Sequence, residues 1–219
     1  LIVLSNWNIW SISVAIITLV IIAPVLAIFY SAFLGDTVLW PHLFSTVLPR
    51  YIANTLILMV GVGCLSLVFG VSTAWVVTRY NFPGKLIFEW ALLLPAAIPA
   101  YIIAYTYTDM FEYAGPVQGM LRDLFGWRSS QDYWFPKIRS MGGATLVMSS
   151  VLYPYIYLMT RISFISTPIS FFQASSIYGR NSFLYVALPL ARPGIVAGLA
   201  LVLMETISDF GTVEYFALD

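Results

Sequence analysis

The sequence predicts an all-α membrane protein, a polytopic bundle of transmembrane helices with about five spans. Hydrophobic residues make up 60% of the 219-residue chain and charged residues only 9%, whereas soluble domains carry about 25% charged residues. The chain therefore has too few charges to cover a surface in contact with water. Several uncharged runs also reach the roughly 20 residues that a helix needs to cross a bilayer.

The five predicted spans are the long apolar stretches of the chain, at residues 9–35, 51–78, 86–108, 140–160 and 193 to about 213. Prolines lie inside four of these segments, and Pro95 and Pro99 both lie in the third. Membrane helices tolerate proline when neighbouring helices satisfy the carbonyls that it frees. We expect packing kinks at these prolines, with a gating hinge as the alternative.

The uncharged run 162–179 is predicted to hold a loop helix rather than a span. Thr167 is a favoured N-cap, Pro168 is favoured at the first helical position, and Gly179 is a favoured stop. The helix between them has about three turns, too short to cross a bilayer. The loop 161–192 would therefore lie on one side of the membrane.

The charges in the loops decide the orientation only in part. Each side of the membrane receives five basic residues, so the positive-inside rule gives a tie. One side mixes its basic residues with acidic ones in the long loop 109–139, as a folded external loop would. We expect that side to be external, which places the loop 161–192 and the N-terminus in the cytoplasm. The chain then divides into 1–50, a first span with an external loop, and 51–219, the main membrane domain.

The loop 161–192 carries the most informative motif, which comprises Gln173, Ala174, Ser175, Gly179, Arg180, Leu188 and Pro189. At these residues the chain resembles the permease subunits of binding-protein-dependent ABC importers. Their cytoplasmic loop reads Glu-Ala-Ala, a spacer, Gly, a second spacer and Ile/Val-x-Leu-Pro. Gln173 replaces the usual glutamate, and only six residues separate Gly179 from Val186, fewer than the family pattern has. The alternative is an ordinary amphipathic loop helix.

The resemblance implies a type I ABC permease fold in a bacterial inner membrane. In that family the loop forms two short coupling helices that dock on a separate ATPase subunit. It further implies a periplasmic or surface substrate-binding protein, a second permease half or subunit, and membrane lipid as partners. No cofactor is expected, and no Walker A sequence occurs, so we expect ATP hydrolysis by the separate subunit and a transporter rather than an enzyme.

The resemblance extends from about Tyr51 to Phe216, and residues 204–216 are similar to the ferric-iron branch of these permeases. Ferric iron is therefore the expected cargo. An anion, thiamine, a polyamine or another small solute is the alternative. Because permeases of that branch are fused duplications, the chain is expected to be most of an N-terminal half without its last span.

Two carboxylates inside the fifth predicted span indicate a translocation path without reference to any family. Glu205 and Asp209 are four residues apart, so they share one helix face. A carboxylate in a membrane normally faces a bundle interior, a partner or water, and hard oxygen ligands suit a trivalent cation. Tyr105 could add a phenol oxygen. Alternatively, Asp209 caps the following turn, Glu205 pairs with a basic group, and Tyr105 belongs to an interfacial aromatic belt.

Other classes of function are disfavoured. The net charge of zero gives no basic surface for nucleic acid. His42 is the sole histidine, so neither a confident metal site nor a catalytic triad can be assembled. A membrane-embedded enzyme would need clustered catalytic groups, and a passive channel would not need the loop motif. Glu89 is expected to pair with Lys85 four residues away, and the glycines of the second and fifth spans are expected to be helix contacts.

Overall fold

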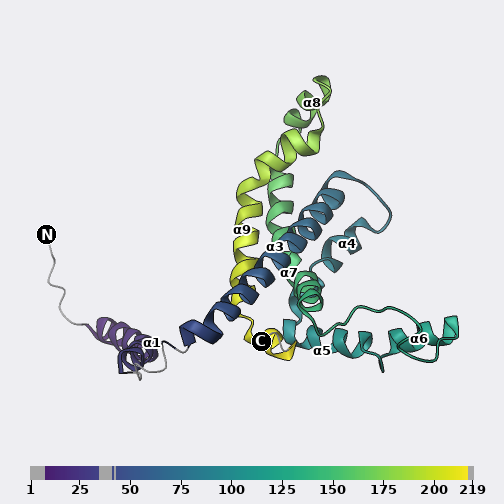
Figure 1. Cartoon of the computed structure of the whole chain (residues 1–219). Helices are drawn as coiled ribbons and strands as arrows, with labels where there is room; N and C mark the ends of the chain where they lie inside the picture. The colour runs from purple at the N-terminus through teal and green to yellow at the C-terminus, as the bar shows by residue number, and fades with distance from the viewer. Residues whose placement is uncertain (1–7, 35–40, 42, 217–219) are drawn as a thin grey trace. The chain divides into compact units, whose positions relative to one another are not determined.

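The computed structural model describes residues 8–34, 41 and 43–216 (Figure 1). Every regular element in the described part of the chain is a helix, which confirms the all-α class. The chain divides into two compact units, Leu1–Pro49 and Arg50–Asp219, which are described separately.

The first unit contains a single long apolar helix, α1, Ile9–Leu34. Asn8 caps it, because the amide of Ile9 donates to the Asn8 side chain at 2.7 Å. The side chains from Ile9 to Ser31 are all exposed, and Pro24 lies inside the helix. A helix that is apolar all round is a membrane span rather than a surface helix. A short π-helical turn, η1, Leu43–Val47, follows, and His42 lies outside the described residues.

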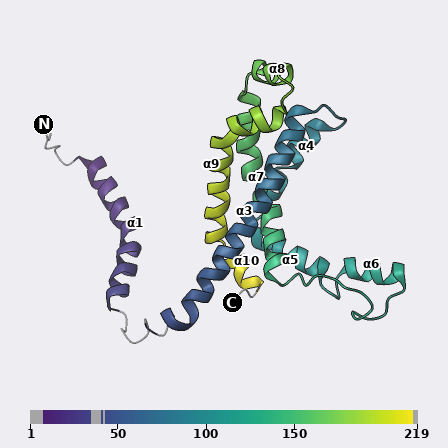
Figure 2. The same cartoon turned by 45° about the horizontal axis from the view of Figure 1, so that its top comes forward.

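The second unit is built on three long helices, α3 (Leu48–Arg79), α7 (Met141–Ser166) and α9 (Leu188–Ser208). Figures 1 and 2 show them side by side. Helix α7 has eleven buried residues, against seven for α3 and four for α9, so α7 is the central helix.

Glycines let these helices approach closely, as the sequence predicted. A Cβ on Gly70 of α3 would lie 2.8 Å from the Cβ of Ile156 in α7. A Cβ on Gly198 of α9 would lie 2.8 Å from the Cα of the same isoleucine. Ile156 is completely buried between the two flanking helices. In a membrane no hydrophobic effect drives helices together, so close packing at small residues stabilises such contacts.

Among the residues described, three helices are long and apolar enough in composition to cross a membrane, Ile9–Ser31, Leu43–Arg79 and Phe183–Ser208. A fourth span is reached if the bent pair Lys85–Ala97 and Ala100–Phe125 counts as one. Helix α7, the predicted fourth span, is 26 residues long but is not among these helices. Its polar residues, such as Ser149 and Thr160, are fully buried against protein and lower its apolar content. The estimate of about five spans agrees roughly with this count.

The predicted third span differs from a kinked helix, because it is broken. It consists of α4 (Lys85–Ala91), a 3-10 turn η2 (Leu94–Ala97) and α5 (Ala100–Phe111), with a bend of 98° before Ala100. Ile98 is extended, at φ −111° and ψ 129°. The ring of Pro99 disfavours the helical conformation of the residue before it, and neither Pro95 nor Pro99 can donate a backbone hydrogen bond. Two prolines so close together therefore end the helix.

The segment after α5 is folded and contains helix α6, Pro116–Phe125. The Gln118 amide donates to the carbonyl of Phe111 at 2.7 Å and accepts from the hydroxyl of Tyr133 at 2.5 Å. Arg139 and Glu112 form an exposed ion pair at 2.6 Å. The hydrogen bond and charge of Glu112 raise the pKa of Arg139.

The predicted fifth span, 193 to about 213, is displaced toward the N-terminus. A π-helical turn, η3, Phe183–Ala187, runs directly into α9, so the helix extends from Phe183 to Ser208. It ends at Asp209, and a short helix α10, Phe210–Tyr215, follows.

Candidate functional sites

The loop helix predicted within 162–179 is present as α8, Ile169–Ile177. It lies at one end of the bundle, beyond the ends of α7 and α9, while α10 lies at the other end (Figure 2). The expected cap is corrected by one residue: Pro168, not Thr167, is the N-cap of α8, while Thr167 ends α7 and donates its hydroxyl to the carbonyl of Ser163 at 2.9 Å. Gly179 follows α8 in the left-handed conformation, at φ +61°, which glycine adopts without strain.

The residues of the predicted coupling motif divide into exposed and anchoring groups. Gln173, Ala174, Gly179 and Arg180 are exposed, whereas Ser175 is only 8% exposed. The hydroxyl of Ser175 lies 2.6 Å from that of Ser182. Ser182 was not among the residues predicted from the sequence. This bond ties α8 to the chain that returns toward the bundle.

The structure corrects the expected second coupling helix. Leu188 and Pro189 are the first residues of α9, and η3 runs into them without a break. Pro189 has no amide to donate, but it comes directly after the π-helical turn, whose wider bond from the Leu188 amide to the Phe183 carbonyl leads into α9, and the helix continues past it. The Asn181 side chain accepts from the amides of Phe183 and Leu184 at 2.9 and 3.3 Å and so starts this helix. Asparagine is a favoured N-cap, a signal that could have revealed the start.

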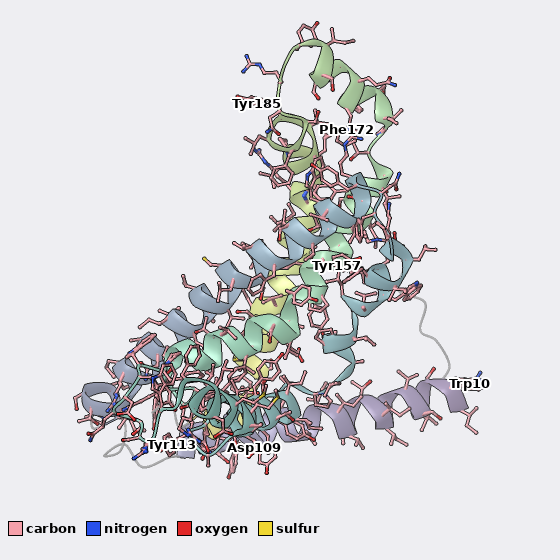
Figure 3. The ribbon with its side chains drawn as sticks, turned by 90° about the vertical axis from the view of Figure 1, so that its right-hand side faces the viewer. Trp10, Asp109, Tyr113, Tyr157, Phe172 and Tyr185 are labelled. Carbon is pink, nitrogen blue, oxygen red and sulfur yellow. The ribbon has the colours of Figure 1, made fainter. Side chains whose placement is uncertain are left out.

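An aromatic cluster joins α8 to the bundle, and the sequence did not predict it. The ring of Trp75 in α3 lies 5.6 Å from Phe164, 6.4 Å from Phe172 and 5.0 Å from Phe183, measured between centroids. These residues belong to α3, α7, α8 and η3. The guanidinium of Arg79 also lies 5.5 Å from the centre of the Phe172 ring. Figure 3 labels Phe172 at this end of the molecule.

The α8 segment also exposes large apolar side chains. Ile177 and Tyr178 are 83% and 80% exposed, and Ile169 is 68% exposed. A short helix that packs on the bundle through Phe172 and exposes other apolar side chains forms a projecting knob. We use the name α8 knob for residues 169–180.

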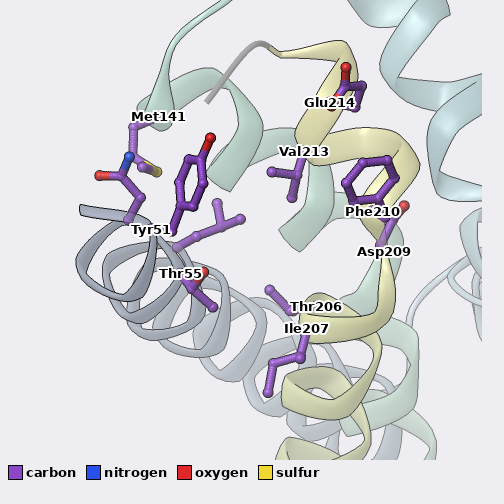
Figure 4. A pocket seen from close by; sticks show the side chains of 11 residues that line it. Tyr51, Thr55, Met141, Thr206, Ile207, Asp209, Phe210, Val213 and Glu214 are labelled. Atoms are coloured by element: carbon purple, nitrogen blue, oxygen red, sulfur yellow. The ribbon is translucent and has the colours of Figure 1, made fainter. Parts of the chain in front are cut away.

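A pocket of about 450 Å³ lies at the other end of the bundle (Figure 4). Its polar lining residues come from α3 and from the α9–α10 region, and they are Tyr51, Asn54, Thr55, Thr206, Asp209 and Glu214. Apolar side chains such as Met141 and Val213 complete the lining. The lining thus combines hydroxyl and amide groups with two carboxylates.

The three residues predicted for a translocation path do not converge on this pocket. Asp209 lines it, but its carboxylate caps α10, accepting from the amide of Thr212 at 3.0 Å and from its hydroxyl at 2.6 Å. Glu205 is exposed and is not part of the lining. Tyr105 is 60% exposed, with its ring 6.0 Å from that of Tyr215. No group of three or more metal-ligating side chains occurs among the residues described.

Comparison with known proteins identifies relatives along most of the chain. Residues 66–219 match the family described as "Binding-protein-dependent transport system inner membrane component". The molybdenum transport permease ModB of Escherichia coli K12 is 27% identical over 154 residues, which cover 69% of this chain and 64% of ModB. The sulfate transport permease CysT of Synechococcus elongatus is 27% identical over 212 residues, 95% of this chain and 73% of CysT. CysW of E. coli K12, also a sulfate permease, is 26% identical over 224 residues. The matched region thus spans less than two thirds of ModB.

Proposed function

Because the chain belongs to the family of binding-protein-dependent transport system inner membrane components, we propose that it is a permease subunit of an ATP-driven importer. The relatives named above are transport permeases and not enzymes. Its role is then to form part of a translocation path and to change conformation when a separate ATPase hydrolyses ATP.

The observation that carries this proposal is the α8 knob. A nine-residue helix is held beyond the bundle by the Trp75 cluster, and it presents Ile177 and Tyr178 outward. Exposed apolar groups of this kind indicate a protein interface. A push on a knob rooted in α3, α7 and η3 would move these elements together.

The partners follow from this arrangement. We propose that a separate ATPase binds the α8 knob on the cytoplasmic side and that the N-terminus lies on the same side. A substrate-binding protein would then approach the end that carries α10 and the pocket. A second permease half or subunit and the lipid of a bacterial inner membrane would cover the remaining apolar faces of the helices.

We propose a small oxyanion as the cargo rather than ferric iron. The names of the relatives refer to molybdenum and sulfate transport. The pocket of about 450 Å³ has room for a tetrahedral oxyanion, and the Thr55 hydroxyl on its wall is a hydrogen-bond donor, whereas the Thr206 hydroxyl already donates to the carbonyl of Val202 at 2.7 Å. Ferric iron, the expectation drawn from residues 204–216, is less well supported, because Asp209 already accepts two hydrogen bonds from Thr212.

Reconstitution decides the cargo. The full-length permease, its ATPase and its binding protein are placed in liposomes, and ATP-dependent uptake of molybdate, sulfate and ferric iron is measured separately. We expect uptake of an oxyanion. Uptake of ferric iron alone would overturn the proposed cargo. If ATP drives no uptake and the binding protein does not stimulate hydrolysis, the importer function itself is wrong.

A bulky substitution tests the α8 knob as the ATPase site. In Ala174→Trp, the new indole would stand on the exposed surface of α8 and block a docked partner. We expect stimulated ATP turnover to fall about tenfold, as for a disrupted interface centre. Ile16→Trp, at a 59% exposed position of α1, is the control and should leave turnover unchanged. Wild-type turnover in Ala174→Trp would refute the assignment.

A further inference from the structure

Three side chains on one face of α7 contact the broken third segment. Tyr153, Tyr157 and Arg161 follow one another at intervals of four residues, so they align along the helix. The Tyr153 hydroxyl donates to the carbonyl of Leu92 at 2.9 Å, and the Tyr157 hydroxyl donates to the carbonyl of Glu89 at 3.2 Å. Nη2 of Arg161 donates to Oε2 of Glu89 at 2.9 Å.

The two carbonyls that accept from the tyrosines lie where α4 ends. In a continuous α-helix they would accept from the amides of Leu93 and Ala96. Those amides instead bond to carbonyls one residue further along the chain, at 3.0 and 3.1 Å, and Pro95 has no amide to offer. The last carbonyls of a helix need other partners. The tyrosine hydroxyls of α7 supply them, so the broken end of α4 is fitted to this face of α7.

The ion pair is shielded from water. The Glu89 and Arg161 side chains are 17% and 26% exposed, whereas the Glu112 and Arg139 pair is 43% and 52% exposed. Charges attract more strongly where water is excluded, and removal of one partner leaves the other desolvated. The pair replaces the expected Lys85–Glu89 contact, because the Lys85 ammonium donates to the side chain of Asn81 at 3.3 Å.

The position of this contact along α7 links it to the α8 knob. Arg161 lies in the last turns of α7, which ends at Ser166, and α8 begins at Ile169. Tyr157 is fully buried in the same cluster as Phe164, Ala187 and Ala191, and Figure 3 labels it on α7. Figures 1 and 2 both show α4 beside the half of the bundle that leads to α8. The 98° bend between Lys85–Ala97 and Ala100–Phe125 means that α4 and η2 do not continue the direction of α5.

We propose that Glu89 and Arg161, supported by the hydroxyls of Tyr153 and Tyr157, form a joint that makes α4 move with α7. A displacement of the α8 knob then reaches the broken third segment through α7. The two charged residues are positioning residues for transport, and they do not touch the cargo. This inference rests on the proposed importer function.

The experiment measures uptake and ATP hydrolysis together in the reconstituted full importer. In Glu89→Gln and in Arg161→Glu, we expect cargo moved per ATP to fall about fivefold or more, in the range of typical coupling between sites, while ATP turnover persists. The double variant Glu89→Arg, Arg161→Glu restores an opposite-charge pair and should recover at least part of the ratio. Glu112→Gln, which breaks the exposed pair, should leave the ratio at the wild-type value.

Assembly of the complex is checked by size-exclusion chromatography. If Glu89→Gln does not assemble, Tyr153→Phe carries the test, because it removes one hydroxyl and keeps the ring; a lower ratio is expected here too. A wild-type ratio in the assembled variants would overturn the joint, and so would a double variant no better than the single ones. Failure of the proposed function is distinguishable, since the wild-type complex itself would then show no ATP-driven uptake.

Discussion

The rings of Trp75 and Phe183 lie 5.0 Å apart between centroids, with an interplanar angle of 57°. This contact connects α3 to the turn that starts α9, and the two residues are 108 positions apart in the chain. Aromatic pairs in this distance range contribute beyond the area that they bury. The contact therefore anchors the loop that carries α8 to a helix distant in sequence.

Replacement of Trp75 by alanine should loosen the α8 knob. The indole contacts three phenylalanine rings, and loss of a large aromatic side chain from such a cluster costs about 2–4 kcal/mol. We expect a lower melting temperature of the purified protein and weaker stimulation of ATP turnover. Trp90→Ala is the control, because Trp90 is 74% exposed. Equal effects of the two substitutions would contradict a special role for the cluster.

Ser175→Ala removes the 2.6 Å contact with Ser182. The net contribution of such a hydrogen bond is about 1 kcal/mol, so we expect only the region around α8 to open more often. Hydrogen exchange of the α8 amides should then be about fivefold faster, with the bundle unchanged. Ser170→Ala, at an exposed position of the same helix, provides the comparison. Unchanged exchange in Ser175→Ala would show that the contact does not hold the knob.

Gly198→Ala should disturb the packing of α9 on α7. The added methyl would lie 2.8 Å from the Cα of Ile156, a backbone atom that cannot move aside alone. Overpacking of this kind costs about 1–3 kcal/mol, visible as a lower melting temperature in detergent. Ala200→Ser adds one atom at an exposed position and should have little effect. An unchanged melting temperature for Gly198→Ala would contradict this prediction, because α9 and α7 would then accommodate the methyl group without loss of stability.

Substitutions at Asp209 separate capping from a role in the path. Asparagine caps helices as well as aspartate does, whereas alanine loses about 1 kcal/mol. If Asp209 acts only as the cap of α10, Asp209→Asn should transport like the wild type and Asp209→Ala should transport less. The measurement is uptake in liposomes at equal protein. Equal losses in both variants would show instead that the negative charge is needed, and Glu205→Gln measures the same requirement at the exposed neighbour.

Local features of the fold could be predicted from the sequence. Pro168 and Gly179 mark the two ends of α8 through backbone chemistry that acts within a few residues. The capping of α10 was available in the same way, since Asp209 and Thr212 are three residues apart. The glycine contacts were also predictable, because small residues in spans seldom serve another purpose.

Features that depend on distant residues could not be predicted. Glu89 has a lysine four residues away, yet it pairs with Arg161, 72 residues further along the chain. The composition of the third segment is compatible with a kinked span; its two prolines indicate an irregularity, but the 98° bend that makes it a broken segment is seen only in the structure. The second coupling helix was wrong because continuity of η3 with α9 depends on packing and not on a local signal.

The polarity of α7 has a consequence for how the protein enters the membrane. Insertion of a helix into lipid depends on its own apolar content, and α7, unlike α1, α3 and α9, is not among the helices whose length and composition suit a membrane span. Its buried polar residues, Ser149, Tyr157 and Thr160, are covered only once the neighbouring helices are present. We therefore expect α7 to integrate poorly as an isolated segment and efficiently when α3 precedes it. The central helix of the bundle would thus be the one least able to enter the bilayer alone.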